Sequence, residues 1–152
     1  MSPRPTIADT SGFTLLEMLV AIAILSLATV GVGMAFPQFQ QRAELRQAAN
    51  KLDSLLARAR EEALSERRPS EVRFRARDRQ LELPSKAIVY RMPKSVSFAV
   101  LGAAGGLNPE EPRIVFLSDG SSTGGVVELR SGGLKVVRRI GWLTGRIEKV
   151  SP

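Results

Sequence analysis

The chain has 152 residues, no cysteine, no histidine and a formal net charge of +7. Without cysteine it can form neither a disulfide nor a thiolate metal site, and without histidine it lacks the commonest general base and zinc ligand. We therefore expect neither an enzyme nor a cofactor, while the positive charge alone fits nucleic acid, anionic lipid and acidic protein equally well.

An apolar segment follows a short polar leader at the start of the chain. Residues 1–12 are polar, and residues 13–36 carry one charged side chain, Glu17. As a helix rising ~1.5 Å per residue, a segment of this length crosses a ~30 Å hydrocarbon core. We therefore predict a transmembrane helix over residues 13–36, with residues 1–12 as a leader.

Two simpler interpretations compete for this segment. A secretory signal peptide would end at small residues such as Gly33-Met34-Ala35, but the apolar run exceeds the roughly 7–15 residues of a signal core. It also has an acid near its start. A plain single-pass anchor explains the length, yet it gives no reason for placing the carboxylate of Glu17 in lipid, which costs free energy.

The junction between leader and apolar segment reads Gly12-Phe13-Thr14-Leu15-Leu16-Glu17. It resembles the prepilin motif of type IV pilins and type II secretion pseudopilins. The resemblance implies that a prepilin peptidase cleaves after Gly12, that Phe13 becomes the N-methylated first residue, and that Glu17 is required for assembly. Cleavage creates an ammonium at Phe13, and Glu17 of a neighbouring subunit can pair with it strongly in the low dielectric of the membrane.

The charges that flank the segment favour a different orientation from the motif. Arg42, Arg46 and Lys51 follow the segment, whereas the leader carries only Arg4. The positive-inside rule would therefore place the body of the protein in the cytoplasm. The resemblance implies the opposite: a single-pass protein of the bacterial inner membrane with its C-terminal head in the periplasm. We follow the motif.

Residues 37–68 are predicted to continue the helix as an amphipathic segment that Pro69 ends. Apolar residues recur there at three-to-four spacing, and charged residues mostly fill the gaps. The apolar face is short and rich in alanine, so we expect it to pack on its own domain rather than on a coiled-coil partner. It comprises Leu45, Ala48, Ala49, Leu52, Leu55, Leu56, Ala59, Ala63 and Leu64.

Residues 69–152 are predicted to form a β-rich head. Val72, Phe74 and Ala76 alternate with arginines, which places the arginines on one face of a strand. Residues 102–112 are predicted to be a loop, and Ser131-Gly132-Gly133 a hairpin turn. Further strands are expected near residues 86–92, 96–101, 113–117, 126–129, 134–140 and 146–150.

The predicted fold class is thus α+β and pilin-like. A long N-terminal helix, transmembrane in its first half and amphipathic in its second, precedes a β-rich globular head. Two segments of the head carry a second resemblance: residues 116–129, FLSDGSSTGGVVEL, and residues 140–147, IGWLTGRI. They are similar to the H-type minor pseudopilins of type II secretion and to the related FimT-like minor pilins.

This second resemblance implies a minor pseudopilin that helps to export folded proteins across the outer membrane. Its expected partners are the major pseudopilin, the other minor pseudopilins, the prepilin peptidase and the inner membrane. The alternative is a FimT-like minor pilin that binds DNA during natural transformation. Those relatives carry a glycine–arginine–any–arginine motif where this chain has Gly145-Arg146-Ile147-Glu148. Because an acid replaces the second arginine, nucleic acid is not expected as a partner.

Two other groups of residues have ordinary interpretations. Asp119 lies in a glycine-rich turn, and a single acid supplies too few ligands for calcium. A group of arginines can bind phosphates in principle, but we interpret it as a solvated strand face and helix end, with some members pairing with acids of neighbouring subunits. This group comprises Arg67, Arg68, Arg73, Arg75, Arg77 and Arg79.

Overall fold

The structure is a computed structural model that describes residues 14–102 and 111–150, with the side chains of all of these except residues 28–38. One long helix and a β-rich head of two antiparallel sheets make up the described residues, which confirms the predicted α+β class. The leader, Gly12 and Phe13 lie outside the described residues, as do residues 103–110 of the predicted loop.

The chain divides into two compact units, residues 1–37 and residues 38–152. Helix α1, Leu15–Ser65, contributes to both units. It ends three residues before the predicted position. Arg67 adopts a left-handed φ of 51°, and Arg68 precedes Pro69, which disfavours the helical conformation.

The apolar face predicted for the second half of α1 lies at the centre of the head. Every residue of that face is buried except Leu64, which is 42% exposed. Burying each leucine of this kind stabilises the fold by roughly 1.5–3 kcal/mol. The strand residues that complete the same core include Val72, Phe74, Leu81, Leu83, Ile114, Phe116, Val127 and Leu129.

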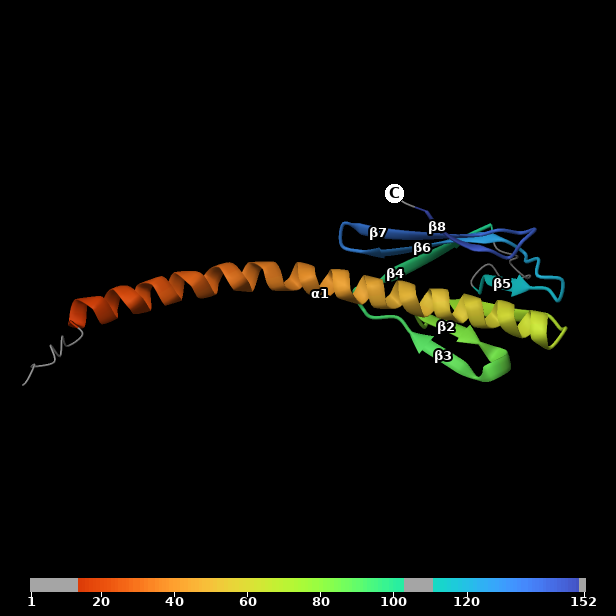
Figure 1. Cartoon of the computed structure of the whole chain (residues 1–152), viewed down its shortest axis with the longest axis horizontal. Coiled ribbons are helices and arrows are strands. Elements are labelled where there is room, and N and C mark those ends of the chain that lie inside the picture. Colours follow the sequence, from red (N-terminus) through yellow and green to blue (C-terminus); the bar gives the residue numbers. More distant parts are fainter. Residues whose placement is uncertain (1–13, 103–110, 151–152) are drawn as a thin grey trace, which may run out of the picture. The chain divides into compact units, whose positions relative to one another are not determined.

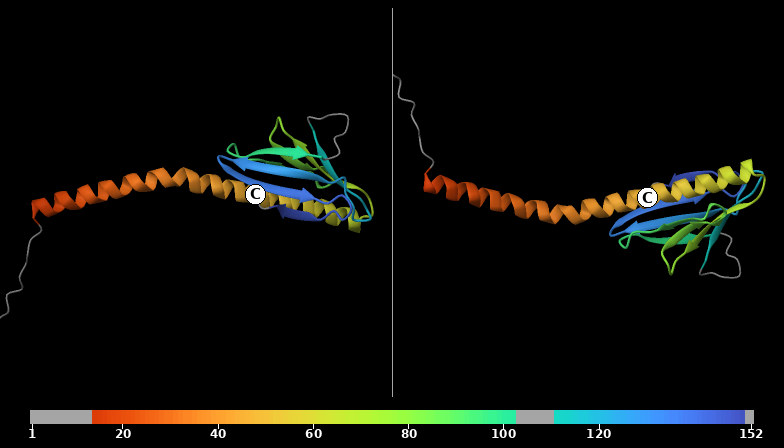
Figure 2. Two further views of the ribbon diagram at one scale, coloured as in Figure 1. Left: turned by 90° about the horizontal axis from the view of Figure 1, so that it is seen from above. Right: turned by 90° about the horizontal axis from the view of Figure 1, so that it is seen from below.

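Two four-stranded antiparallel sheets lie alongside the part of α1 that belongs to the head (Figures 1 and 2). The first sheet has the order β3-β2-β1-β5, and the second has the order β4-β6-β7-β8. The bounds in the first sheet are β1 Ser70–Arg75, β2 Gln80–Leu83, β3 Ile88–Arg91 and β5 Arg113–Phe116. The bounds in the second sheet are β4 Ser97–Leu101, β6 Gly125–Ser131, β7 Leu134–Ile140 and β8 Ile147–Val150.

Most predicted strands are present, with two differences. The prediction that Ala76 and Arg77 continue the first strand is wrong, because residues 76–79 form the turn into β2 and Ala76 is exposed. Strand β2 was not predicted. The strand predicted over residues 86–92 begins later, at Ile88, because the 3-10 turn η1, Pro84–Lys86, precedes β3.

The predicted turn at Gly132 and Gly133 joins β6 to β7. Ser131 pairs with Leu134 across it, and Gly132 has a φ of 57°. A Cβ at Gly132 would lie 2.7 Å from Oε1 of Gln41, so the hairpin tip lies directly against the start of the head's part of α1.

Candidate functional site

Glu17, the predicted assembly residue, lies in the first turn of α1 with its side chain exposed. Thr14 directly precedes the helix, and its Oγ1 accepts a hydrogen bond of 3.3 Å from the backbone N–H of Glu17. The threonine hydroxyl thus satisfies one of the free N–H groups at the helix start, in the sequence pattern of a capping box. The carboxylate of Glu17 is placed at the positive end of the helix dipole.

The side chains around Glu17 are apolar and exposed. Between Leu15 and Leu27 the large apolar side chains are 50% to 80% exposed. In the part of the chain that the structure describes, no helix combines the length and the apolarity needed to cross a membrane. The side chains of residues 28–36, the second part of the predicted segment, lie outside the described residues. The transmembrane helix stays a prediction.

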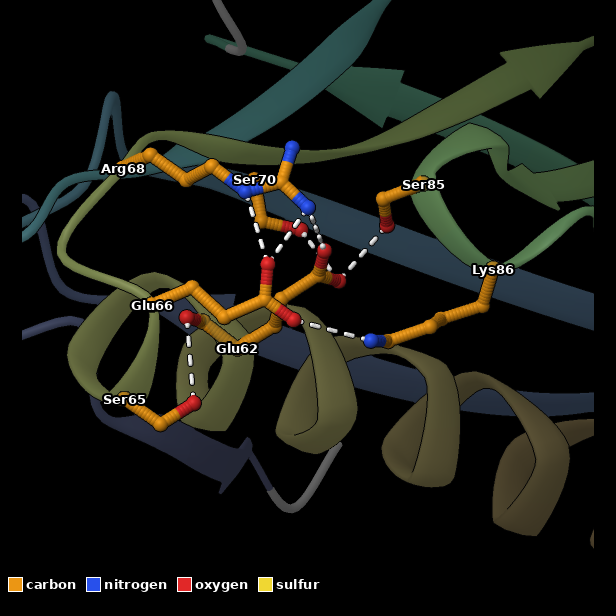
Figure 3. Close-up of polar contacts among 7 residues, drawn as sticks. All are labelled: Glu62, Ser65, Glu66, Arg68, Ser70, Ser85 and Lys86. Carbon is orange, nitrogen blue, oxygen red and sulfur yellow. Dashed lines mark hydrogen bonds and ion pairs between the residues drawn. The ribbon is translucent and has the colours of Figure 1, made fainter.

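A buried carboxylate ties the C-terminal end of α1 to the first sheet (Figure 3). Glu62 is 4% exposed, and its carboxylate accepts hydrogen bonds from Oγ of Ser70 at 3.1 Å and from Oγ of Ser85 at 2.6 Å. Nη2 of Arg68 lies 3.2 Å from the other oxygen. Three donors thus satisfy this buried charge, so the cluster has an ordinary structural role at the contact between α1 and β1.

Glu66 forms the outer layer of the same cluster. Its carboxylate lies 2.5 Å from Nη2 of Arg68 and 2.9 Å from Nζ of Lys86. The hydrogen bonds from Lys86 and then from Arg68 lower the pKa of Glu66, and Glu66 in turn raises the pKa of Lys86. We call Glu62, Glu66, Arg68, Ser70, Ser85 and Lys86 the helix-end clamp.

Arg68, Arg73 and Arg75 pair with acids of their own chain. Arg73 lies 2.5 Å from Glu71, and Arg75 lies 3.2 Å from Glu82. Arg79 instead donates from Nη2 to two backbone oxygens of the β3–β4 loop, those of Pro93 at 2.5 Å and Val96 at 2.6 Å. The predicted solvent exposure is confirmed for Arg68, Arg73 and Arg75, whose side chains are 56%, 40% and 37% exposed. The acids that pair with them belong to the same chain, and pairing with neighbouring subunits stays a prediction.

A second buried ion pair joins α1 to the other sheet. Arg138 of β7 is 7% exposed, and its guanidinium makes two hydrogen bonds to Asp53, from Nε at 2.7 Å and from Nη2 at 3.1 Å. This pair was not predicted from the sequence. The signal was present, because Arg138 alternates with Val136 and Ile140 on the inward side of the strand, and a buried arginine requires an acid.

Asp119 caps its own turn. Its Oδ1 accepts hydrogen bonds from the backbone N–H of Ser121 at 2.9 Å and from the hydroxyl of the same residue at 2.6 Å, which lower the pKa of Asp119. The carboxylate of Asp119 therefore stabilises the turn by accepting these two hydrogen bonds. Among the residues described, no three or more acids or other ligand types lie close enough together to hold a metal ion.

The C-terminal motif borders a hollow beside the end of α1. Gly145 has a φ of 58°, and a Cβ there would lie 2.5 Å from the backbone oxygen of Gly120. Arg60 donates to the backbone oxygen of Thr144 at 3.3 Å. The hollow has a volume of about 620 Å³ and is lined by Ala57, Arg60, Glu61, Leu64, Ser65, Gly145, Arg146 and Ile147.

Two family models match separate parts of the chain. The model described as "Prokaryotic N-terminal methylation motif" matches residues 8–33, which include Gly12, Phe13 and Glu17. The model described as "Type II transport protein GspH" matches residues 48–142, which include most of the head. No curated protein sequence matches the chain.

Solved structures share the fold. The type IV minor pilin FimU of Pseudomonas aeruginosa is 18% identical, with a TM-score of 0.57, and the match covers 74% of this chain and 92% of that chain. The minor pseudopilin EpsH from the type 2 secretion system of Vibrio cholerae is 16% identical, with a TM-score of 0.55 and coverage of 72% and 98%. At these identities the likeness is one of fold, and it agrees with the predicted pilin-like architecture.

Proposed function

This chain belongs to the GspH family of type II transport proteins, so its role is that of a minor pseudopilin in type II secretion, and we propose how it performs that role. The observation that carries the proposal is the combination of two matches in one chain. The methylation motif over residues 8–33 supports processing and membrane anchoring, and the GspH match over residues 48–142 supports the secretion role.

The proposed mechanism begins with processing. The prepilin peptidase cleaves after Gly12 and methylates Phe13, while residues 13–36 hold the chain in the bacterial inner membrane with the head in the periplasm. Two observations support this step. The methylation motif covers the cleavage position, and the first part of α1 itself carries large, exposed apolar side chains. The uncleaved chain is the substrate of that peptidase, and the protein needs no catalysis of its own.

Assembly follows from the new N-terminus. The ammonium at Phe13 pairs with Glu17 of a neighbouring subunit, and the helices bundle into a short filament with the major pseudopilin and the other minor pseudopilins. The exposed position of Glu17 supports this step, because its carboxylate has no ion pair among the described residues. Placing an unpaired carboxylate in the hydrocarbon core of a membrane costs roughly 2.5–3.5 kcal/mol of insertion free energy. Pairing with an ammonium is therefore strongly favoured. The filament then moves folded proteins through the outer-membrane channel.

DNA binding in natural transformation is the second candidate, and the C-terminal motif does not favour it. Arg146 and Glu148 are both exposed, and Glu148 on β8 lies directly opposite Arg139 on β7. An acid at this position repels the phosphates that Arg146 and Arg139 would attract. The likeness to the type IV minor pilin FimU supports the shared fold and adds nothing for DNA.

A deletion strain of the source bacterium tests the proposal. We expect loss of the gene to reduce secretion of type II substrates and to leave DNA uptake unchanged. The wild-type chain should restore secretion, whereas Glu17→Ala should not, although it should still be processed. Normal secretion in the deletion strain together with reduced DNA uptake would replace this function with the second candidate.

A further inference from the structure

We propose that one end of the head is a docking surface for anionic phospholipid. This surface, the basic collar, consists of Arg42 and Arg46 of α1, Lys94 of the β3–β4 loop, and Arg130 and Lys135 beside the β6–β7 turn. The proposal rests on the proposed function in one respect, because it requires residues 13–36 to be held in a membrane.

The helix supplies an exposed face to the collar. Phe39, Arg42 and Arg46 follow one another at spacings of three and four residues, so they lie on the same side of α1. All three are exposed, and Phe39 is 68% exposed. Leu45 is buried in the core at 3% exposure, whereas Phe39 and the two arginines stay exposed, so the core does not cover this side of the helix.

Two loops bring further cations to the same end of the head. The hairpin tip lies against Gln41, and Arg130 and Lys135 face each other two residues from Gly132 and Gly133. The β3–β4 loop reaches the helix through Ser95, whose hydroxyl donates a hydrogen bond to the carboxylate of Glu44. Lys94, the residue before Ser95, is exposed. Figure 1 shows the β6–β7 turn beside the first turns of the head's part of α1.

The collar keeps a positive charge after its own acids are counted. Glu128 pairs with both Lys135, at 2.8 Å, and Arg130, and these contacts lower the pKa of Glu128. Glu44 is the other carboxylate at this end, and it accepts the hydrogen bond from Ser95. The collar thus contains five basic side chains and two carboxylates. In the described part of the chain, Arg42, Arg46 and Lys94 form no ion pair.

Chain connectivity favours lipid over nucleic acid or an acidic protein. Arg42 follows the end of the apolar segment by six residues, which reach at most about 21 Å even when fully extended. When that segment is held in a bilayer, Arg42 stays within about two Debye lengths of the headgroups, each ~8–10 Å. At this distance salt does not fully screen the attraction between the collar and anionic lipid. Phe39 then lies at the interface, where an exposed apolar ring is stabilised by partial insertion.

The collar also accounts for the cations that follow the apolar segment. The positive-inside rule would read Arg42 and Arg46 as a signal for a cytoplasmic body. Bound to anionic headgroups of the outward-facing leaflet, the same cations hold the head of an unassembled subunit on the membrane surface. Entry into the filament would then release the head from the lipid.

The chain has no cysteine, so one introduced cysteine can carry a single fluorophore. Gly133→Cys places it at the hairpin tip, where a Cβ meets open space. The full chain is reconstituted in vesicles that contain a headgroup-labelled acceptor lipid. We expect energy transfer to be stronger with phosphatidylglycerol than with phosphatidylcholine alone, and to fall as salt is raised.

The triple variant Arg42→Gln/Arg46→Gln/Lys94→Gln tests the residues. Each cation near an anionic surface is worth roughly a fivefold change in the ratio of docked to undocked heads, so the three together change it by about a hundredfold. The matched control is Arg58→Gln/Arg139→Gln/Lys149→Gln, which removes the same charge from exposed positions outside the collar. We expect the control to keep the lipid-dependent transfer.

The outcomes separate this inference from the proposed function. Two results would overturn the collar and leave the pseudopilin role intact. In the first, the chain stays in the membrane but energy transfer does not depend on lipid charge. In the second, both triple variants lose the lipid-dependent energy transfer equally. Loss of partner pseudopilins from the collar variant, with no effect of lipid charge, would assign the surface to a protein instead. A chain that alkaline carbonate strips from the vesicles would overturn both the anchor and the collar.

Discussion

Arg138 shows how the head tolerates charge in its interior. Its guanidinium binds both carboxylate oxygens of Asp53, so neither side chain leaves a charge unpaired. Removing one partner of a buried pair is costly, because the remaining charge keeps its desolvation penalty. Replacing both partners with apolar side chains removes the penalty and the attraction together.

We predict that Asp53→Ala destabilises the head by about 3 kcal/mol. This is the lower end of the roughly 3–5 kcal/mol measured for buried pairs, since the side chain of Asp53 is 26% exposed. The double variant Asp53→Leu/Arg138→Met should recover most of the loss. Denaturant unfolding of the detergent-solubilised chain measures both changes. Equal destabilisation of the double variant would contradict the account.

The sequence predicts residues of a local motif better than pairs of residues that are far apart in the chain. The motif at Gly12, Phe13 and Glu17 was visible because cleavage and assembly depend on local sequence and spacing. The structure describes Glu17 alone of these three, so the roles of Gly12 and Phe13 stay predictions. The Arg138–Asp53 pair joins residues far apart in the chain, and the alternation within one strand reveals the buried arginine without naming its partner.

At the scale of elements, the helix-end clamp fixes the end of α1 to the first sheet. Glu66 takes part as a charged group, and its hydrogen bonds to Lys86 and Arg68 lower its pKa. A lowered carboxyl pKa adds stability above the unfolded value, and that stability is lost as the pH falls through the folded value. The contribution should therefore be fully present at neutral pH, begin to fall below about pH 4.5, the ordinary value for this group, and be lost as the pH falls through the lower folded pKa.

Glu66→Gln should lower the unfolding midpoint near neutral pH and have little effect at strongly acidic pH. The reason is that wild-type Glu66 is itself neutral there and no longer binds Lys86 as a charge. Thermal unfolding of the detergent-solubilised wild type and variant at several pH values measures the difference. Glu61→Gln, an exposed change on the same helix, is the control. A difference between Glu66→Gln and wild type that persists unchanged in acid would refute this role.

Elements were predictable where their periodicity was long. The three-to-four pattern of α1 and the alternation in β7 each extend over enough residues to define a buried face. β2 was missed because Gln80–Leu83 contains only two apolar residues, Leu81 and Leu83, which pack into the core of the head. Ala76 was placed in a strand because alternation alone does not mark where a turn begins.

At the scale of the whole molecule, the two units have different surfaces. The described part of residues 1–37 exposes large apolar side chains, and residues 38–152 enclose a core of their own. Under the proposed function the first unit anchors the chain and polymerises, and the second unit presents a folded head. The residue that links anchoring to polymerisation is Glu17, because its carboxylate needs the ammonium of another subunit.

The recovery of partner pseudopilins with the affinity-tagged chain from membranes tests this central claim most directly. The wild-type chain should begin at an N-methylated Phe13 and should bring the major and other minor pseudopilins with it. Glu17→Ala should remain in the membrane with the same mature N-terminus, because the change removes a charge from the bilayer, but it should recover few of these partners. Equal recovery by wild type and Glu17→Ala, or recovery of type IV pilins in place of pseudopilins, would contradict the account.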